Sequence, residues 1–265
     1  AITRDMEWGV PIPMEGWDSK VIYVWFDAVI GYLSASKEYS KIIGKPDYWK
    51  EYWMDPEVRH YYFLGKDNIP FHSIIWPSIL MGYGGLTLPY DIPANEYLMY
   101  KGGKFSKSRG GAIDMPTVLS KYDSDVVRFY LSIVMPDTHD SEFSWEDFQT
   151  KVNNELVANL GNYYHRCLSF TKKNFGFVPE SDGVKDEVAQ EIDRAFKEYS
   201  EYMQSCDFKK AIKVIMDLSH FGNRYFDSMK PWALVKSDKD ACGRVMNTNL
   251  RIVKALCVMA WPFTP

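Results

Sequence analysis

The sequence predicts an α/β first part followed by an all-α second part. In the first part, short apolar runs rich in β-branched and aromatic residues alternate with segments of helical periodicity, as in parallel strands joined by helices. In the second part, apolar residues recur at helical spacing over several long segments, which predicts an antiparallel helical bundle. A chain of 265 residues can hold about two such domains.

Three buried strands are expected in the α/β part, at residues 21–26, 59–64 and 92–100. Helical spacing follows the first two strands, over residues 28–37 and 69–83, and a proline divides the second helix. Ligands of a parallel sheet lie beyond the carboxyl ends of its strands. The residues after each strand are therefore candidate site residues.

The pattern changes after Pro116. Two short helices are predicted at residues 117–122 and 125–134, then a long helix over residues 144–173 that begins on an acidic turn. Further helices are predicted at residues 187–204, 208–229 and 239–261. We therefore expect three parts, at residues 1–112, 113–143 and 144–265.

Composition excludes several classes of protein. Hydrophobic residues make up 46% of the chain and charged residues 25%, as in an ordinary globular protein. The four cysteines lack Cys-x-x-Cys spacing, so we expect reduced thiols and no zinc site. A net charge of −4 gives no global sign of nucleic acid binding, but a local basic patch is enough to bind an RNA loop. No apolar run is long enough to predict a membrane span.

A basic, glycine-rich loop at residues 100–111 is the most distinctive segment. Its glycines let the backbone approach a ligand, while Lys104 and Lys107 supply positive charge and Ser106 and Ser108 supply hydrogen-bond donors. This combination favours a phosphate ligand. The alternative is a solvated basic turn.

Two segments of the α/β part carry further candidate residues. Trp25 and Tyr32 can form the walls of an aromatic pocket, or can simply pack into a core. After the second strand, Gly65 allows close approach of a ligand and Asp67 can accept hydrogen bonds from ribose hydroxyls. The alternative there is a helix cap, and His72 taken alone is more often a core histidine.

The bundle also contains a candidate binding set. Asn162 and Arg166 are four residues apart and share a helix face, and Trp232 lies where another helix ends. Amide, guanidinium and aromatic groups read and stack unpaired RNA bases. The alternative is a bundle whose polar residues face solvent and whose Trp232 is in the core.

The Lys-x-Ser-Lys-Ser run at residues 104–108 resembles the Lys-Met-Ser-Lys-Ser signature of class I aminoacyl-tRNA synthetases, with Phe105 in place of methionine. The segments beginning at residues 24, 63 and 159 resemble, in the same order, segments of the methionyl-tRNA synthetase family. The resemblance implies the C-terminal half of a Rossmann-like nucleotide-binding domain followed by a helical-bundle anticodon-binding domain.

The resemblance also implies residue roles. It assigns catalysis to Lys104, Lys107, Arg4 and Lys66; ATP binding to Gly65, Asp67, Lys104, Ser106, Lys107 and Ser108; a methionine pocket to Trp25, Ala28, Val29, Tyr32 and His72; and anticodon binding to Asn162, Arg166 and Trp232.

The function implied by the resemblance is that of a methionine-tRNA ligase. The methionine carboxylate attacks the α-phosphate of ATP and releases pyrophosphate, and the adenylate then passes its acyl group to tRNA(Met). The implied partners are methionine, ATP with Mg²⁺ and tRNA(Met), in the cytoplasm, with no DNA, no membrane and no metal ligands in this chain.

One signature of the family, His-Ile-Gly-His, is absent from the sequence, and the chain opens on Ala1. We therefore expect a piece of a longer protein that does not form the adenylate alone. The alternatives are a class I synthetase for leucine, isoleucine, valine or cysteine, a non-catalytic tRNA-binding protein of the same fold, and a plain α/β scaffold with a helical interaction domain.

Overall fold

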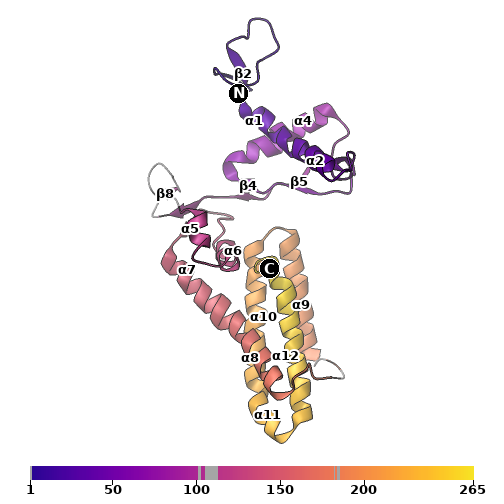
Figure 1. Cartoon of the computed structure of the whole chain (residues 1–265), viewed down its shortest axis with the longest axis vertical. Helices are drawn as coiled ribbons and strands as arrows, with labels where there is room; N and C mark the ends of the chain where they lie inside the picture. Colours follow the sequence, from indigo (N-terminus) through magenta and orange to yellow (C-terminus); the bar gives the residue numbers. More distant parts are fainter. Residues whose placement is uncertain (1, 101–102, 105–112, 182, 184–185) are drawn as a thin grey trace. The chain divides into compact units, whose positions relative to one another are not determined.

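The computed structural model describes residues 2–100, 103–104, 113–181, 183 and 186–265. The chain divides into two compact units, Ala1–Glu96 and Tyr97–Pro265 (Figure 1). Each unit contains hydrophobic clusters of its own. Among the described helices, none combines the length and the apolar character needed to cross a bilayer.

The first unit consists of short strands and helices. In chain order these are β1 (Thr3–Asp5), β2 (Lys20–Ile22), α1 (Val24–Asp27), the 3₁₀ helix η1 (Ala28–Ile30), α2 (Gly31–Ile42), α3 (Trp49–Trp53), β3 (His60–Tyr61), β4 (Leu64–Gly65), the 3₁₀ helix η2 (Lys66–Asn68), the π-helical η3 (Phe71–Ile75), α4 (Trp76–Tyr83), β5 (Pro89–Asp91) and β6 (Ala94–Asn95). Strand β1 pairs antiparallel with β2, β3 pairs parallel with β5, and β4 pairs parallel with β6.

The prediction of a buried parallel strand at residues 21–26 is wrong beyond Ile22. The described strand pairs antiparallel with β1, and the chain turns at Tyr23 into α1. In the helical segment that follows, Val29 is buried, whereas Val24 and Trp25 remain exposed. A short apolar run does not distinguish a strand from a one-sided helix, and helical packing determines the structure here.

The second predicted strand, at residues 59–64, is present as two short pieces. The register of β3 against β5 shifts between His60, opposite Pro89, and Tyr61, opposite Asp91, and pairing resumes in β4 with Leu64 opposite Ala94. The predicted parallel arrangement is therefore confirmed at the strand that precedes Lys66. The predicted helix over residues 69–83 is also present, as η3 and α4, but it is not divided at Pro77: the run changes from π-helical to α-helical at Trp76 and continues through the proline.

The core of the first unit is aromatic. Val29, Trp53, Tyr62, Trp76 and Leu80 are its buried members. The indole of Trp76 donates to the Tyr62 hydroxyl at 2.8 Å, so a buried donor and a buried hydroxyl satisfy each other.

The second unit begins with a small sheet and ends with a helical bundle. In chain order its elements are β7 (Leu98–Tyr100), β8 (Gly103–Lys104), α5 (Met115–Leu119), α6 (Ser124–Ile133), β9 (Ser141–Phe143), α7 (Trp145–Lys151), the π-helical η4 (Val152–Gly161), α8 (Asn162–Asn174), α9 (Asp186–Gln204), α10 (Phe208–Met229), α11 (Pro231–Ser237) and α12 (Lys239–Ala260). Strand β7 lies between β8, which is antiparallel to it, and β9, which is parallel to it. Strand β9 was not predicted.

The predicted bundle is confirmed. Helices α9, α10 and α12 run side by side, and α11 closes one end (Figure 1). The long helix predicted at residues 144–173 is one helical run, formed by α7, η4 and α8. Ser144 caps its start by accepting the backbone N–H of Asp147 at 3.0 Å.

Tyr163 of α8 packs directly against Gly222 of α10. Its side chain is fully buried, and its hydroxyl donates to the side-chain oxygen of Asn249 at 3.0 Å. Burial raises the pKa of Tyr163 well above its ordinary value, so the phenol stays neutral. Gly222 of α10 faces the ring, and a Cβ added there would lie 2.5 Å from Tyr163 Cζ.

Gly222→Ala should therefore destabilise the bundle, because the added methyl group overlaps a ring that has no room to move. We expect the free energy of unfolding to fall by about 1–3 kcal/mol. Urea denaturation followed by helical circular dichroism measures this change. Gly82→Ala, in α4 where an added Cβ meets nothing within 4 Å, is the control and should be neutral or slightly stabilising. Equal stability of the two variants would contradict the packing argument.

A long-range ion pair ties the start of α10 to the segment before β9. Lys209 Nζ lies 3.1 Å from Asp137 Oδ1. Burial alone would raise the pKa of Asp137, but the hydrogen bonds from Lys209 and from the Thr138 backbone N–H outweigh burial and lower it.

Lys209→Met should lower the free energy of unfolding at pH 7 by at most about 1 kcal/mol. A lowered folded-state pKa stabilises the fold above the unfolded-state value of about 3.9 and loses that effect as the pH falls through the folded-state value. The difference between the variant and the parent should therefore vanish in acid, as measured by urea denaturation across pH 2–7. A difference that stays constant over that range would exclude the ion pair as its cause.

Candidate functional site

Tyr32 and His72 form a hydrogen-bonded pair in the first unit. His72 Nδ1 lies 2.9 Å from the carbonyl oxygen of Asn68, which can only accept, so Nδ1 carries the proton. His72 Nε2 is then an acceptor, and the Tyr32 hydroxyl donates to it at 2.8 Å. The histidine is buried, with a hydrogen bond at each ring nitrogen.

The predicted aromatic residues meet around η3. Trp25 stacks on Phe71 with ring centroids 4.9 Å apart, and Phe71 directly precedes His72. Trp25, Tyr32 and His72 thus belong to one cluster, although forty residues separate Tyr32 from His72. Val29 instead lies in the core, and Ala28 is exposed.

A hollow of about 370 Å³ lies beside Tyr32. Its lining residues are mostly aromatic: Tyr32, Ser36, Tyr52, Trp53, His60, Tyr61, Tyr62 and Phe63. Burial raises the pKa of Tyr62, so its phenol stays neutral. Sequence reasoning missed Trp53, His60 and Tyr62 as wall residues. The aromatic run at residues 60–63 was the available signal, but it was interpreted only as a strand.

The end of β4 is open to a ligand. A Cβ added to Gly65 would meet nothing within 4 Å, so the backbone here is accessible. Lys66 forms an ion pair with Glu96, and Asp67 is exposed. Asp27 does not cap a helix with its side chain, and its Oδ1 is buried with no hydrogen-bond partner among the described residues.

The other residues predicted for ATP binding and catalysis lie on β1 and in the basic loop. Arg4 lies opposite Val21 in the β1–β2 pair, with its guanidinium 4.3 Å from the centroid of the Tyr23 ring. Lys104 is in β8, opposite Met99. Ser106, Lys107 and Ser108 lie outside the described residues. Over the described ranges, no group of three or more His, Cys, Asp or Glu side chains is placed to hold a metal ion.

Arg166 of α8 contacts three side chains of α10. It forms an ion pair with Asp227, and its Nη1 donates to the side-chain oxygen of Asn223 at 3.2 Å. Its guanidinium carbon lies 4.4 Å from the centroid of the Phe226 ring. Phe226 in turn lies 6.1 Å from Trp232, ring centroid to ring centroid. Trp232 is 45% exposed and is therefore not a core residue.

The amide of Asn223 is itself fixed in orientation. Its Nδ2 donates to the carbonyl oxygen of Asn159 at 3.3 Å, which leaves its oxygen directed at Arg166. Asn159 is buried in the π-helical η4 and donates to the Met216 carbonyl oxygen. Sequence reasoning missed Asn159, Asn223 and Asp227. For Asn223 and Asp227, the available signal in the sequence was that residues 223, 226 and 227 share a face of α10.

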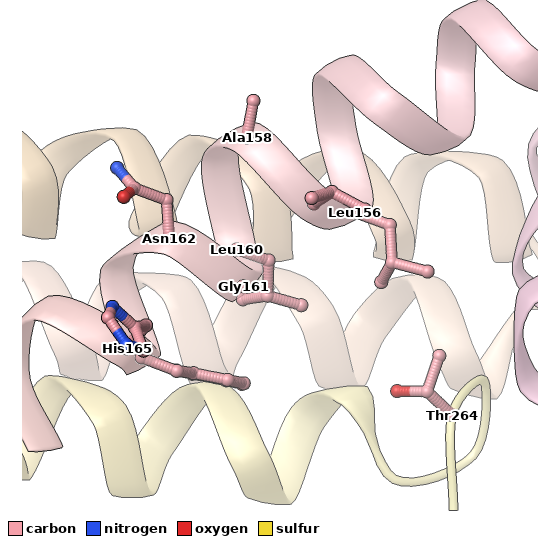
Figure 2. Close-up of a pocket in the computed structure, with 9 residues that line it drawn as sticks. Leu156, Ala158, Leu160, Gly161, Asn162, His165 and Thr264 are labelled. Atoms are coloured by element: carbon pink, nitrogen blue, oxygen red, sulfur yellow. The ribbon is translucent and has the colours of Figure 1, made fainter. Parts of the chain in front are cut away.

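Asn162 is exposed one turn before Arg166. It borders a hollow of about 750 Å³ between the η4–α8 segment and Thr264, just past the end of α12 (Figure 2). The hollow is lined mainly by apolar residues of η4, so Asn162 is a polar group at its rim. Asn162, Arg166 and Trp232 thus lie on the outer surface of the bundle.

Comparisons with known proteins agree with this arrangement. Residues 1–168 match the family described as tRNA synthetases class I (M), and residues 178–265 match the anticodon binding domain of methionyl tRNA ligase. A methionine–tRNA ligase of Thermoplasma volcanium is 46% identical over 265 residues, and one of Pyrococcus abyssi is 49% identical over 282. All of this chain aligns with both, but it covers only 49% and 39% of their lengths.

A solved structure agrees as well. Mycobacterium tuberculosis methionyl-tRNA synthetase bound by methionyl-adenylate superposes with a TM-score of 0.82 at 28% identity, over 100% of this chain and 52% of that one. The predicted fold class and family are therefore confirmed, and the family match favours methionine over the leucine, isoleucine, valine and cysteine alternatives. With family models accounting for most of its length, the chain belongs to the class I tRNA synthetases of the methionyl family.

Proposed function

We propose that this chain works in a methionine–tRNA ligase, which activates methionine with ATP and transfers it to tRNA(Met) in the cytoplasm. The observation that carries this proposal is the Tyr32–His72 pair beside Trp25, which offers an aromatic, neutral surface to a side chain. Membership of the methionyl family and the methionyl-adenylate in the M. tuberculosis structure support it.

In the proposed pocket, Trp25, Tyr32 and His72 contact the methionine side chain, Ala28 keeps the entrance open, and Val29 supports the wall from the core. A thioether sulfur gains about 0.3–1.5 kcal/mol against an aromatic ring. Because Tyr32 and His72 are hydrogen-bonded to each other, neither polar group is left unpaired when an apolar side chain excludes water.

ATP is proposed to bind at the end of β4. Gly65 lets a nucleotide approach the backbone, and Asp67 accepts from its ribose hydroxyls. Lys66 and Arg4 lie near the reacting carboxylate and α-phosphate. The proposed loop ligands are Lys104, Ser106, Lys107 and Ser108.

In the proposed reaction the methionine carboxylate attacks the α-phosphate and pyrophosphate leaves. The lysines offset the negative charge that develops on the β- and γ-phosphates. We assign Mg²⁺ to the phosphates of ATP, because the described residues offer no cluster of metal ligands.

We further propose that residues 1–112 form the catalytic part, residues 113–143 the connection and residues 144–265 the anticodon-binding part. Trp232 stacks on an anticodon base, while Asn162 and Arg166 donate to base edges. The exposure of Trp232 and the fixed guanidinium of Arg166 support this role. A non-catalytic tRNA-binding protein would keep this surface but would lack methionine affinity.

The methionine pocket is tested by binding. Tyr32→Phe removes the donor to His72 and should weaken binding of a non-hydrolysable sulfamoyl analogue of methionyl-adenylate roughly fivefold, the effect of losing one buried hydrogen bond. Tyr39→Phe, on the exposed side of the same helix, is the matched control. Isothermal titration of both variants, with the norleucyl analogue beside the methionyl one, measures the loss and the preference for sulfur. Equal affinities for the two analogues would exclude methionine specificity.

The anticodon site is tested with an RNA stem-loop. Trp232→Ala should weaken binding of a stem-loop carrying the cytosine-adenine-uracil triplet roughly tenfold, because a stacked base loses its platform. Trp261→Ala removes another exposed indole of the bundle and serves as the control. Fluorescence anisotropy measures both affinities. The site assignment would fail if the two variants lost affinity equally or if a scrambled triplet bound as well as the original.

A further inference from the structure

A third hollow, of about 800 Å³, lies where the segment after α8 meets the first turns of α12. We call it the α8–α12 hollow. Phe175, Phe177 and Pro179 come from the segment after α8, and Lys239, Gly243 and Arg244 come from α12. None of these residues belongs to the sites described above.

The floor of the α8–α12 hollow is held in place. Gly243 faces Pro179, and a Cβ added to Gly243 would lie 3.2 Å from the proline ring. Asn247 Nδ2 donates to the Pro179 carbonyl oxygen at 2.7 Å and so fixes the segment against α12. A hollow built this way is present before a ligand binds, which lowers the entropy cost of binding.

The walls carry the groups that a nucleotide needs. Phe177 is 66% exposed, an unusual position for a benzyl side chain and one from which it can stack on a base. Lys239 Nζ lies 5.7 Å from the Phe175 ring centroid, and Arg244 is exposed. Neither cation forms an ion pair with a carboxylate in the part of the chain that the structure describes. Two carboxylates, those of Glu180 and Asp240, also line the hollow and can accept from ribose hydroxyls or base amino groups.

The α8–α12 hollow is linked to the proposed anticodon surface through the contact of α12 with α11. Cys242 Sγ donates to the Pro231 carbonyl oxygen at 3.5 Å, so the side chain of Cys242 holds the first residue of α11 against α12. Trp232 follows Pro231, and Gly243 follows Cys242. An RNA strand whose base stacks on Trp232 can therefore reach the hollow with a neighbouring nucleotide.

We propose that the α8–α12 hollow binds one unpaired nucleotide of the tRNA loop, next to the triplet and independently of its base identity. Phe177 stacks on the base, Lys239 and Arg244 contact its phosphate, and the carboxylates accept from its sugar or base edge. This inference rests on the proposed tRNA-binding function and adds a second contact to it.

The test measures anisotropy of the labelled stem-loop with the whole chain, at several salt concentrations. Arg244→Ala should weaken binding of the original and the scrambled triplet alike, by roughly three- to tenfold. It should also lower the magnitude of the slope of log affinity against log salt by about 0.7, the value expected for the loss of one phosphate contact to a single strand. Phe177→Leu keeps an apolar side chain but removes the ring, and should weaken both RNAs roughly fivefold or more. Lys254→Ala, an exposed cation farther along α12, is the control and should change neither quantity.

The outcomes separate this inference from the proposed function. If the parent chain bound the original and the scrambled triplet equally well, and Arg244→Ala still weakened RNA binding, the proposed reading of the anticodon would be overturned. The hollow would remain an RNA-binding site. If the parent chain preferred the original triplet, but Arg244→Ala and Phe177→Leu bound RNA as tightly as Lys254→Ala, the hollow would not be an RNA-binding site. It would then bind a peptide ligand or no ligand. Circular dichroism of each variant confirms that it is folded before its affinity is compared.

Discussion

The contact between Gly222 and Tyr163 is the constraint on which the proposed RNA-binding surface depends. Because glycine has no side chain, α8 and α10 approach closely enough for the Tyr163 ring to fill the space where a Cβ would stand. One residue after Gly222 on α10 is Asn223, and three residues after Tyr163 on α8 is Arg166; these two side chains are hydrogen-bonded across the same interface. The guanidinium of Arg166 is also held by its ion pair with Asp227 and by its contact with the Phe226 ring. If the two helices were farther apart, the Arg166 side chain would be exposed to solvent, and its N–H donors would no longer be held in one orientation.

In the first unit, too, a side-chain hydrogen bond between two helical elements positions the candidate site. The Tyr32–His72 hydrogen bond joins α2 to η3, and the Asn68 carbonyl oxygen fixes which nitrogen of His72 accepts. Behind this pair, Trp76 donates to Tyr62, so the polar atoms of the aromatic core satisfy one another. A site of this kind remains apolar without carrying unpaired polar groups. It can therefore exclude water around an apolar substrate side chain while keeping its shape. A wall of aliphatic side chains would also exclude water, but it would have no hydrogen bonds to fix the orientation of its side chains.

Sequence patterns predicted the bundle better than the α/β part, for a physical reason. The bundle helices are long and one-sided, so their periodicity is unambiguous, and α10 matches its predicted range of 208–229. The run at residues 21–26 is short and apolar throughout, a pattern that fits a buried strand or a packed helix equally well, and only tertiary packing decides between them. Trp25, Tyr32 and His72 were predicted together from the family resemblance, but the tautomer of His72 and the role of Asn223 were not. The first involves the Tyr32–His72 contact across 40 positions and the second the Arg166–Asn223 contact across 57, which no local pattern encodes.

Net charge was the least informative property of the sequence, and the ion pairs explain why. Several bundle cations outside the proposed RNA surface are paired within one helical turn, as in Lys210 with Asp207, Lys213 with Asp217 and Arg194 with Glu191. Such pairs contribute to the count of charged residues but present little net field to a ligand. Lys239 and Arg244 form no ion pair among the described residues, although the carboxylates of Glu180 and Asp240 line the same hollow, and the chain total of −4 gives no sign of this local arrangement. A polyanion responds to that local field within about one Debye length, roughly 10 Å, and not to the total. An acidic protein can therefore bind RNA through a local group of cations, even where the total charge of the chain is negative.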